Sequence, residues 1–233
     1  MNENVDIFIG THKNYVFPTN NVYKIISNSK EKLDTNLKIY YEENEPLHDL
    51  FADVIRIDYI KRNIKLKDYV GLVQYRRNFE FYNDVPNIEE IFNDYDIILP
   101  NQYNFNLYYS FAKMHDLHTI DTCLDILYEL YPDFPISREN FKQINTINLH
   151  NIFIMKSKDF YNMHNFLFSI FNEFIKRENF NTMDDVKKYV EKYYGMYDSN
   201  NVRLFGFLGE RLISVYCMVN FKNPKYINVI ENI

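Results

Sequence analysis

Tryptophan, cysteine and glycine are scarce in this sequence of 233 residues, which contains none, two and five of them, respectively. Cys123 and Cys217 have no metal-type spacing, so we expect buried free thiols rather than a zinc site or a disulfide framework. The few glycines form neither a Gly-x-Gly-x-x-Gly turn nor a phosphate-binding lysine loop, which argues against a dinucleotide or P-loop site. Gly-x-Ser-x-Gly and His-Glu-x-x-His motifs are also missing, so neither serine hydrolase nor zinc peptidase chemistry is indicated.

An excess of basic charge and long apolar runs are missing as well. The formal net charge of −6 argues against a protein that binds nucleic acid through its phosphates. No stretch approaches 18 uninterrupted apolar residues, and the first six residues, MNENVD, are acidic and lack an apolar signal core. We therefore expect a soluble, cytoplasmic protein without a nucleic-acid partner.

The apolar pattern predicts an α/β fold. Short apolar runs at residues 5–10, 37–41, 69–75, 95–100 and 151–155 are typical of strands buried on both faces, as in a mainly parallel sheet. Helical spacing of apolar residues follows at 120–130, 160–174, 182–193 and 208–219. This order predicts one domain, 1–233, with a mostly helical C-terminal part.

Two motifs could mark a ligand site. Asp94 and Asp96 form an Asp-x-Asp pair, but they precede the apolar run 97–99, whereas α/β sheets bind ligands where strands end. We interpret this pair as solvated residues at a strand entry. Arg76 and Arg77 directly follow a buried strand, and each guanidinium can bind phosphate with two hydrogen bonds. A structural Arg–carboxylate network is the alternative; the position at the strand end favours an anion site.

Residues 71–79 (GLVQYRRNF) carry a resemblance to a known family. They closely match the GLxHYRRxF signature of a bacterial glycosyltransferase-like family, long catalogued as a domain of unknown function and found in capsule and lipopolysaccharide gene clusters. Further blocks are similar in the same order: 9–13 (IGTHK, with the THK turn), 95–100 (YDIILP), 131–134 (YPDF, for YPEY), 151–155 (NIFIM, for NMFIM) and 203–212 (RLFGFLGERL, for RVFGFLAERL). Asp53 stands where the family usually has Glu. Gln74 replaces the usual His, and the segment between Tyr41 and Asp53 is shorter than usual.

The resemblance implies a glycosyltransferase A-type, Rossmann-like fold that moves a sugar from a nucleotide-diphosphate donor to an oligosaccharide or lipid-linked glycan acceptor. Residues 1–100 would form the nucleotide-sugar half and 101–233 the acceptor-side half. The family's expected donor-binding residues are Thr11, His12, Lys13, Tyr75, Arg76 and Arg77. The last three would take the place of a metal-binding Asp-x-Asp, so no metal cofactor is expected. A lipid-linked acceptor would allow a peripheral position at the cytoplasmic face of the inner membrane.

The resemblance also implies a catalytic base. Glu210, near the start of the last helix, would deprotonate the acceptor hydroxyl, with His115 as the other candidate. A structural salt bridge of Glu210 with Arg211 or Arg203 is the alternative. Asn151 and Asp121 are expected on the acceptor side. Because neighbouring residues of an extended strand point to opposite faces, we expect unequal roles for Arg76 and Arg77 unless the chain turns there. A catalytically silent nucleotide- or glycan-binding partner in a polysaccharide-assembly complex is the competing function.

Overall fold

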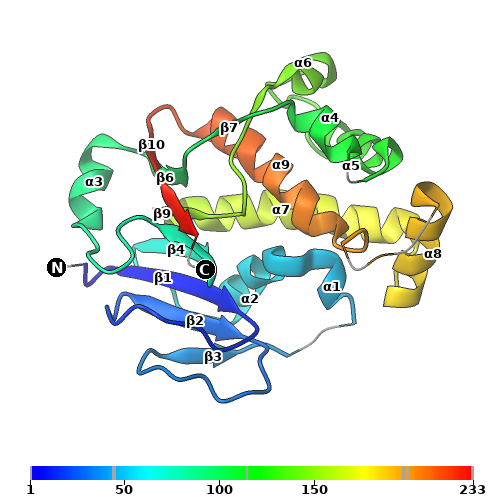
Figure 1. Ribbon diagram of the computed structural model, residues 1–233. Coiled ribbons are helices and arrows are strands. Elements are labelled where there is room, and N and C mark those ends of the chain that lie inside the picture. Colours follow the sequence, from blue (N-terminus) through cyan, green and yellow to red (C-terminus); the bar gives the residue numbers. More distant parts are fainter. Residues whose placement is uncertain (1, 44–45, 114, 196–197, 199, 232–233) are drawn as a thin grey trace.

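The computed structural model describes residues 2–43, 46–113, 115–195, 198 and 200–231. Its centre is a mixed, mostly parallel sheet (Figure 1). In this sheet β1 (Val5–Thr11) lies between β2 (Tyr23–Ser27) and β4 (Tyr69–Gln74), and both neighbours run parallel to it. Beyond β2 lies β3 (Ile39–Tyr41). Beyond β4 follow β9 (Phe153–Lys156), β6 (Ile97–Pro100) and β10 (Pro224–Ile227), of which β9 alone is antiparallel to its neighbours.

All five predicted strands occur, and all belong to this sheet. Strand β2 was not predicted, because Lys24 interrupts its apolar run; its ammonium lies 3.7 Å from the carboxylate of Asp6. The C-terminal part is not purely helical, since it supplies β9, β10 and β11 (Val229–Glu231) to the same sheet. Strand β11 pairs with β5 (Arg77–Phe79), and β7 (Tyr103–Asn104) pairs with β8 (Thr146–Ile147) in a separate ribbon.

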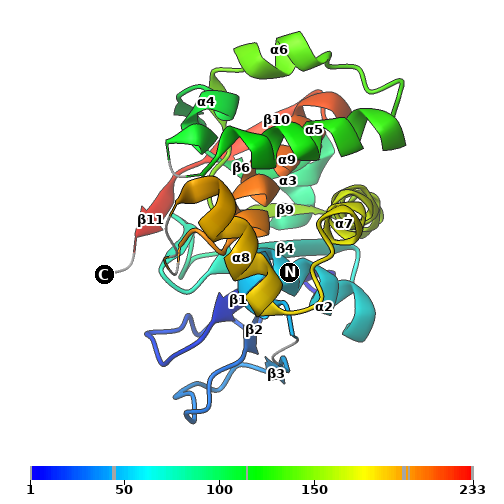
Figure 2. The ribbon, with the colours of Figure 1, turned by 90° about the vertical axis from the view of Figure 1, so that its right-hand side faces the viewer.

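The helices form a layer against one face of the sheet and a smaller cover on the other (Figure 2). The four predicted helices are confirmed as α5 (Leu117–Leu130), α7 (Ser157–Glu178), α8 (Met183–Tyr194) and α9 (Leu204–Asn220). The others are α1 (His48–Phe51), the 3₁₀ turn η1 (Ala52–Val54), α2 (Ile55–Asn63), α3 (Ile88–Asp94), α4 (Leu107–Ala112) and α6 (Arg138–Gln143).

Strand β1 shows why the sheet is buried on both faces. Successive side chains of a strand point to opposite faces, and here both sets are apolar. Phe8 packs into the large cluster formed with the helices, whereas Ile7 and Ile9 pack into the cluster that includes Ile88 of α3. In the described part of the chain, no helix is both long and apolar enough to cross a membrane.

Two glycines let α9 approach the turn η1 closely. A methyl group added at Gly206 would lie 2.9 Å from the Cβ of Ala52, and one added at Gly209 would lie 2.6 Å from a methyl of Val54. Such distances leave no room for a side chain. This contact sets Asp53, between Ala52 and Val54, beside the face of α9 that carries Glu210.

We expect Gly209→Val to destabilise the protein, because overpacking a filled contact costs about 1–3 kcal/mol. Urea unfolding measures the loss. Gly195→Asn is the matched control: Gly195 has a φ of 74° with nothing within 4 Å of an added Cβ, and asparagine tolerates this conformation. Equal stability of Gly209→Val and wild type would contradict the close packing of α9 on η1.

Candidate active site at the carboxyl ends of β1 and β4

The strands β1 and β4 end side by side. Gly10 pairs with Gln74 in the sheet, and the backbone N–H of Tyr75 donates a hydrogen bond of 3.1 Å to the carbonyl of Gly10. The chain turns at Tyr75 and Arg76 and returns as β5, in which Arg77 pairs with Gln74. This hairpin presents both arginines at the sheet edge where α/β folds bind ligands.

Basic and polar groups surround the ring of Tyr75. The ring of His12 packs edge-on at 5.1 Å, while the ammonium of Lys13 and the guanidinium of Arg76 lie 5.7 and 5.3 Å from the ring centre. Thr11 is buried and its hydroxyl donates to the carbonyl of Lys13 at 2.7 Å, so it shapes the turn rather than facing solvent. Burial, followed by the charge of Arg56, lowers the pKa of His12, which favours the neutral imidazole.

A pocket of about 670 Å³ opens next to this cluster. Among the residues predicted for the site, Arg76, Arg77, Asn151 and Glu210 line it. The other lining residues are Ala52, Asp53, Gln74, Phe105, Ser110, Lys113, Leu149, His150, Arg203, Gly206, Phe207 and Arg211. A second cavity of about 690 Å³ lies near the amino ends of β2 and β3, between residues 17–24 and 34–38, and contains none of the predicted site residues.

The two arginines have different surroundings. Arg77 pairs through Nε with the carboxylate of Glu231 at 2.9 Å and donates from Nη1 to Gln74 at 3.4 Å. Arg76 is exposed and, within the described residues, forms no ion pair. The turn brings both side chains to the pocket, but Arg77 is held by β11 while Arg76 remains available to a ligand.

Gln74, which departs from the family signature, connects the parts of the site. Its amide nitrogen donates to Asp53 Oδ2 at 2.8 Å and to the carbonyl of His150 at 3.0 Å. Its amide oxygen accepts the hydrogen bond from Arg77. A neutral amide can both donate and accept at every pH, so this position joins η1, β5 and the turn before β9 without a titrating group.

A buried arginine, not found by sequence reasoning, supports Asp53. Arg56 of α2 bonds to Asp53, lies 3.3 Å from Glu42 and donates to the carbonyl of Thr11 at 3.5 Å. Its side chain fills the space where Gly10 has no Cβ; an added Cβ would lie 2.7 Å from the Cδ of Arg56. Within α2, Arg56 follows the apolar Ile55 and precedes Ile57, so no periodic signal marks it as a site residue.

Glu210 is held by two hydrogen bonds inside the pocket. Its carboxylate accepts the backbone N–H of His150 at 2.8 Å and pairs with Arg211 at 3.1 Å. Burial raises the pKa of Glu210, and Arg211 opposes that rise. Helix α9 begins at Leu204, so Glu210 lies in its second turn, in the first half of the last helix. Glu210 also forms the salt bridge to Arg211 that was expected if this carboxylate is structural rather than catalytic.

The turn before β9 is strained at two residues. His150 and Asn151 have left-handed φ values of 73° and 54°, which cost non-glycine residues about 1–3 kcal/mol each and occur often at functional sites. Asn151 donates to the carbonyl of Gly206 at 3.3 Å, and its buried Oδ1 has no partner among the described residues. Burial and the charge of Arg77 lower the pKa of His150 to about 4. Sequence reasoning did not find His150, because its backbone N–H and carbonyl, and not its side chain, form the hydrogen bonds to Glu210 and Gln74.

Thr11, His12, Lys13 and Tyr75 form the cluster beside the pocket without lining it, and two further predicted residues, His115 and Asp121, lie outside both. His115 is buried between the rings of Phe111 and Phe207, and burial lowers its pKa to about 3, which leaves a neutral ring. Asp121, on α5, accepts the hydroxyl of Tyr108 at 3.0 Å. The structure does not bring either side chain together with Arg76 and Glu210.

The Asp-x-Asp pair lies at a strand entry, as interpreted. Asp94 ends α3, and Asp96 accepts the backbone N–H groups of Lys222 and Asn223, each at 3.1 Å, just before β6. It therefore joins β6 to the loop before β10. In the described ranges, no group of three or more His, Cys, Asp or Glu side chains is placed to hold a metal ion.

We expect Gln74→Glu to destabilise the protein at neutral pH, because a carboxylate has no proton to donate to Asp53 or to the carbonyl of His150. An acceptor left without its donor costs about 1–3 kcal/mol. Repulsion by Asp53 raises the new group's folded-state pKa, so the penalty applies above the unfolded pKa and fades as pH falls below the folded one. Urea unfolding at pH 8 and pH 4.5 measures both values. The uncharged Gln74→Ala, as a control, should lack this pH dependence; a constant difference for Gln74→Glu would contradict the contact.

Comparison with known proteins gives a family and a fold. The chain is similar to the apo structure of WbbM, a bifunctional glycosyltransferase, with a TM-score of 0.73 and 18% sequence identity over 98% of this chain and 45% of that one. It is also similar to core-mannan synthase A from Aspergillus fumigatus in its Mn/GDP form, with a TM-score of 0.45 and 8% identity over 93% of this chain and 70% of that one. No curated protein matches.

The chain spans less than half the length of the WbbM structure that it matches. The shared architecture confirms the expected A-type glycosyltransferase fold, a mostly parallel mixed sheet with helices. A family model described as "Domain of unknown function (DUF4422)" matches residues 6–222. Because this match covers nearly the whole chain, the protein belongs to the DUF4422 family.

Proposed function

We propose that the protein transfers a sugar from a nucleotide-diphosphate donor to a glycan acceptor in the synthesis of capsular polysaccharide or lipopolysaccharide. One observation carries this proposal: the arginine hairpin after β4 and the carboxylate of Glu210 line the same pocket at the ends of β1 and β4. A concave site at this edge is where α/β folds bind nucleotides. The A-type fold shared with WbbM, a bifunctional glycosyltransferase, supports it.

In this proposal the donor diphosphate lies against Arg76, with His12 and Lys13 beside it on the ring of Tyr75. A guanidinium binds two phosphate oxygens at once and is charged throughout the physiological range. It can therefore neutralise the departing nucleoside diphosphate without a metal ion. Arg77, paired with Glu231, would hold the hairpin in position and add to the positive potential at the donor diphosphate.

The acceptor would lie between the hairpin and α9. Glu210 is proposed as the base that takes the proton of the acceptor hydroxyl, because its raised pKa makes it a better proton acceptor than an exposed Glu. Asn151 Oδ1, buried and without a partner in the described residues, would accept a hydrogen bond from a sugar hydroxyl. His115 is not part of this proposal, since it is buried outside the pocket lining. A lipid-linked acceptor would place the reaction at the cytoplasmic face of the inner membrane.

The second candidate, a catalytically silent nucleotide- or glycan-binding partner, is favoured by a specific contact. Both oxygens of Glu210 are already engaged, one by the His150 N–H and one by Arg211, as in a purely structural salt bridge. A silent protein would bind nucleoside diphosphates yet leave a nucleotide sugar intact. Slow hydrolysis of the donor, or its transfer to a glycan, separates the two candidates.

Glu210→Gln should leave nucleoside diphosphate affinity near wild type and lower donor turnover by ~10²–10⁴-fold, the usual contribution of a positioned base. Nucleoside diphosphate release from a panel of nucleotide sugars measures turnover, and calorimetry measures affinity. Glu191→Gln, an exposed change of the same kind on α8, is the control. Loss of folding stability and binding together, without a selective effect on turnover, would support the structural salt bridge.

Arg76→Ala should weaken nucleoside diphosphate binding by roughly 1.5–3 kcal/mol, the value of a charge-assisted hydrogen bond. Arg76→Lys should restore only part of it, because an ammonium does not bind two oxygens in a planar fork. Arg77→Ala is the matched comparison and should mainly lower stability, since it frees Glu231. Calorimetry with UDP, GDP and dTDP measures all three. If both alanine variants stay folded and bind like wild type, the donor site lies elsewhere.

A further inference from the structure

The pocket is far more basic than the chain as a whole. Its basic side chains are Arg76, Arg77, Lys113, Arg203 and Arg211, against two carboxylates. The whole chain, by contrast, has a formal net charge of −6. Positive charge therefore gathers in one concave site, where walls of low dielectric constant strengthen its attraction for anions.

Ion pairs neutralise only part of this charge. Arg211 pairs with Glu210, and Arg77 pairs with Glu231. Arg76, Lys113 and Arg203 form no ion pair within the part of the chain that the structure describes. Arg76 is assigned above to the donor diphosphate. Two further cations, Lys113 and Arg203, thus face the pocket without a role in that assignment.

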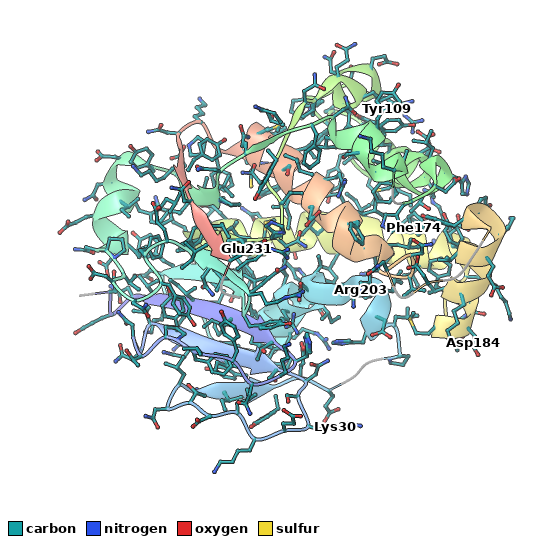
Figure 3. The ribbon with its side chains drawn as sticks, viewed as in Figure 1. Lys30, Tyr109, Phe174, Asp184, Arg203 and Glu231 are labelled. Carbon is teal, nitrogen blue, oxygen red and sulfur yellow. The ribbon has the colours of Figure 1, made fainter. Side chains whose placement is uncertain are left out.

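Arg203 lies at the far end of the pocket from the sheet. Residues 203, 206, 207 and 210 line the pocket at i, i+3, i+4 and i+7 spacing, so they form one stripe of α9 and its N-cap. At 1.5 Å per residue, Arg203 and Glu210 are about 10 Å apart along the helix axis. The hydrogen bond from His150 holds Glu210 at the sheet end. In Figure 3, Arg203 lies beside α1, apart from Glu231, the partner of Arg77.

The contacts of α4 and His115 with α9 indicate that Lys113 also lies toward the Arg203 end of the pocket. Helix α4 contacts α9 at Ser110, whose hydroxyl accepts a hydrogen bond of 3.1 Å from Arg211. Farther along the chain, the ring of His115 packs 4.4 Å from that of Phe207, one turn nearer the start of α9. Ser110 and His115 thus both contact α9, and the contact of His115 lies nearer Arg203. Lys113 stands between these two residues in the sequence and lines the same pocket as Arg203.

The wall between the two ends suits a sugar. Gly206 presents no side chain, and the neighbouring Phe207 and Phe105 line the pocket with aromatic surface. A sugar ring can pack its apolar face there while its hydroxyls reach Glu210 and Asn151. An anionic group attached to that sugar would then extend away from the donor, along α9.

We propose that Arg203 and Lys113 bind an anionic group of the acceptor, a phosphate or a carboxylate, at a subsite separate from the donor diphosphate. The inference rests on the proposed glycosyltransferase function and names the class of acceptor: a sugar that carries phosphate or a uronic acid. Arg203, with its fork of N–H donors, contacts the oxygens, and Lys113 adds charge. The subsite orients the acceptor with its hydroxyl toward Glu210.

The test is a titration of protein already saturated with whichever of UDP, GDP or dTDP binds most tightly. The probes are α-D-glucose 1-phosphate for the phosphate source, methyl β-D-glucuronide for the carboxylate source and neutral methyl β-D-glucoside. At least one anionic probe should bind better than the neutral one. Arg203→Ala and Lys113→Ala should each weaken its binding by about tenfold or more, the effect of one charge-assisted contact. Both should leave nucleoside diphosphate affinity near wild type.

Two controls separate the possible failures. Arg76→Ala should show the reverse pattern, with weaker nucleoside diphosphate binding. Lys30→Ala removes an exposed charge that does not line the pocket and lies apart from Arg203 in Figure 3, so it should change neither. The inference is overturned if Arg203→Ala and Lys113→Ala weaken the nucleoside diphosphate as much as Arg76→Ala does. It is also overturned if the anionic probes bind no better than the glucoside. No nucleoside diphosphate binding to wild type contradicts the donor site instead, and the probes titrated alone then report on the subsite.

Discussion

The amide of Gln74 is the contact on which the site depends. Alone among the pocket residues it bonds at once to η1 through Asp53, to β5 through Arg77 and to the turn before β9 through the His150 carbonyl. The His150 N–H in turn holds Glu210, so the residues proposed for the donor side and for the acceptor side share one hydrogen-bonded frame. A side chain that titrates near neutral pH at this position would couple the frame to pH, whereas the amide keeps it constant.

Close packing completes this frame from the other side. Gly206 and Gly209 let α9 press against η1, and Gly10 leaves room for Arg56 behind Asp53. The three glycines thus do not form a phosphate-binding loop; they allow a helix and a buried arginine to approach. Positive charge is left at two ends of the pocket, around Arg76 and around Arg203, with Glu210 held on the same face of α9.

Local pattern was enough to predict five strands of the central sheet, the long helices and the position of Arg76 and Arg77, because buried strands and helix stripes leave a clear period in the sequence. Strand β2 was missed because Lys24 breaks its run. Arg56 and His150 were missed for a different reason: one is a buried arginine that stands between Ile55 and Ile57 in the sequence, and the other acts through its backbone. His115 shows the converse, since the histidine expected as the other candidate base is packed among aromatic rings and does not line the pocket.

The location of the donor tests the account most directly. A crystal structure of the protein with a nucleoside diphosphate, grown with a chelator, should show the diphosphate hydrogen-bonded to Arg76 beside the ring of Tyr75, with its terminal phosphate toward Glu210. Binding that requires a divalent cation would contradict the role given to the arginine. So would a nucleotide found in the other large cavity, between residues 17–24 and 34–38.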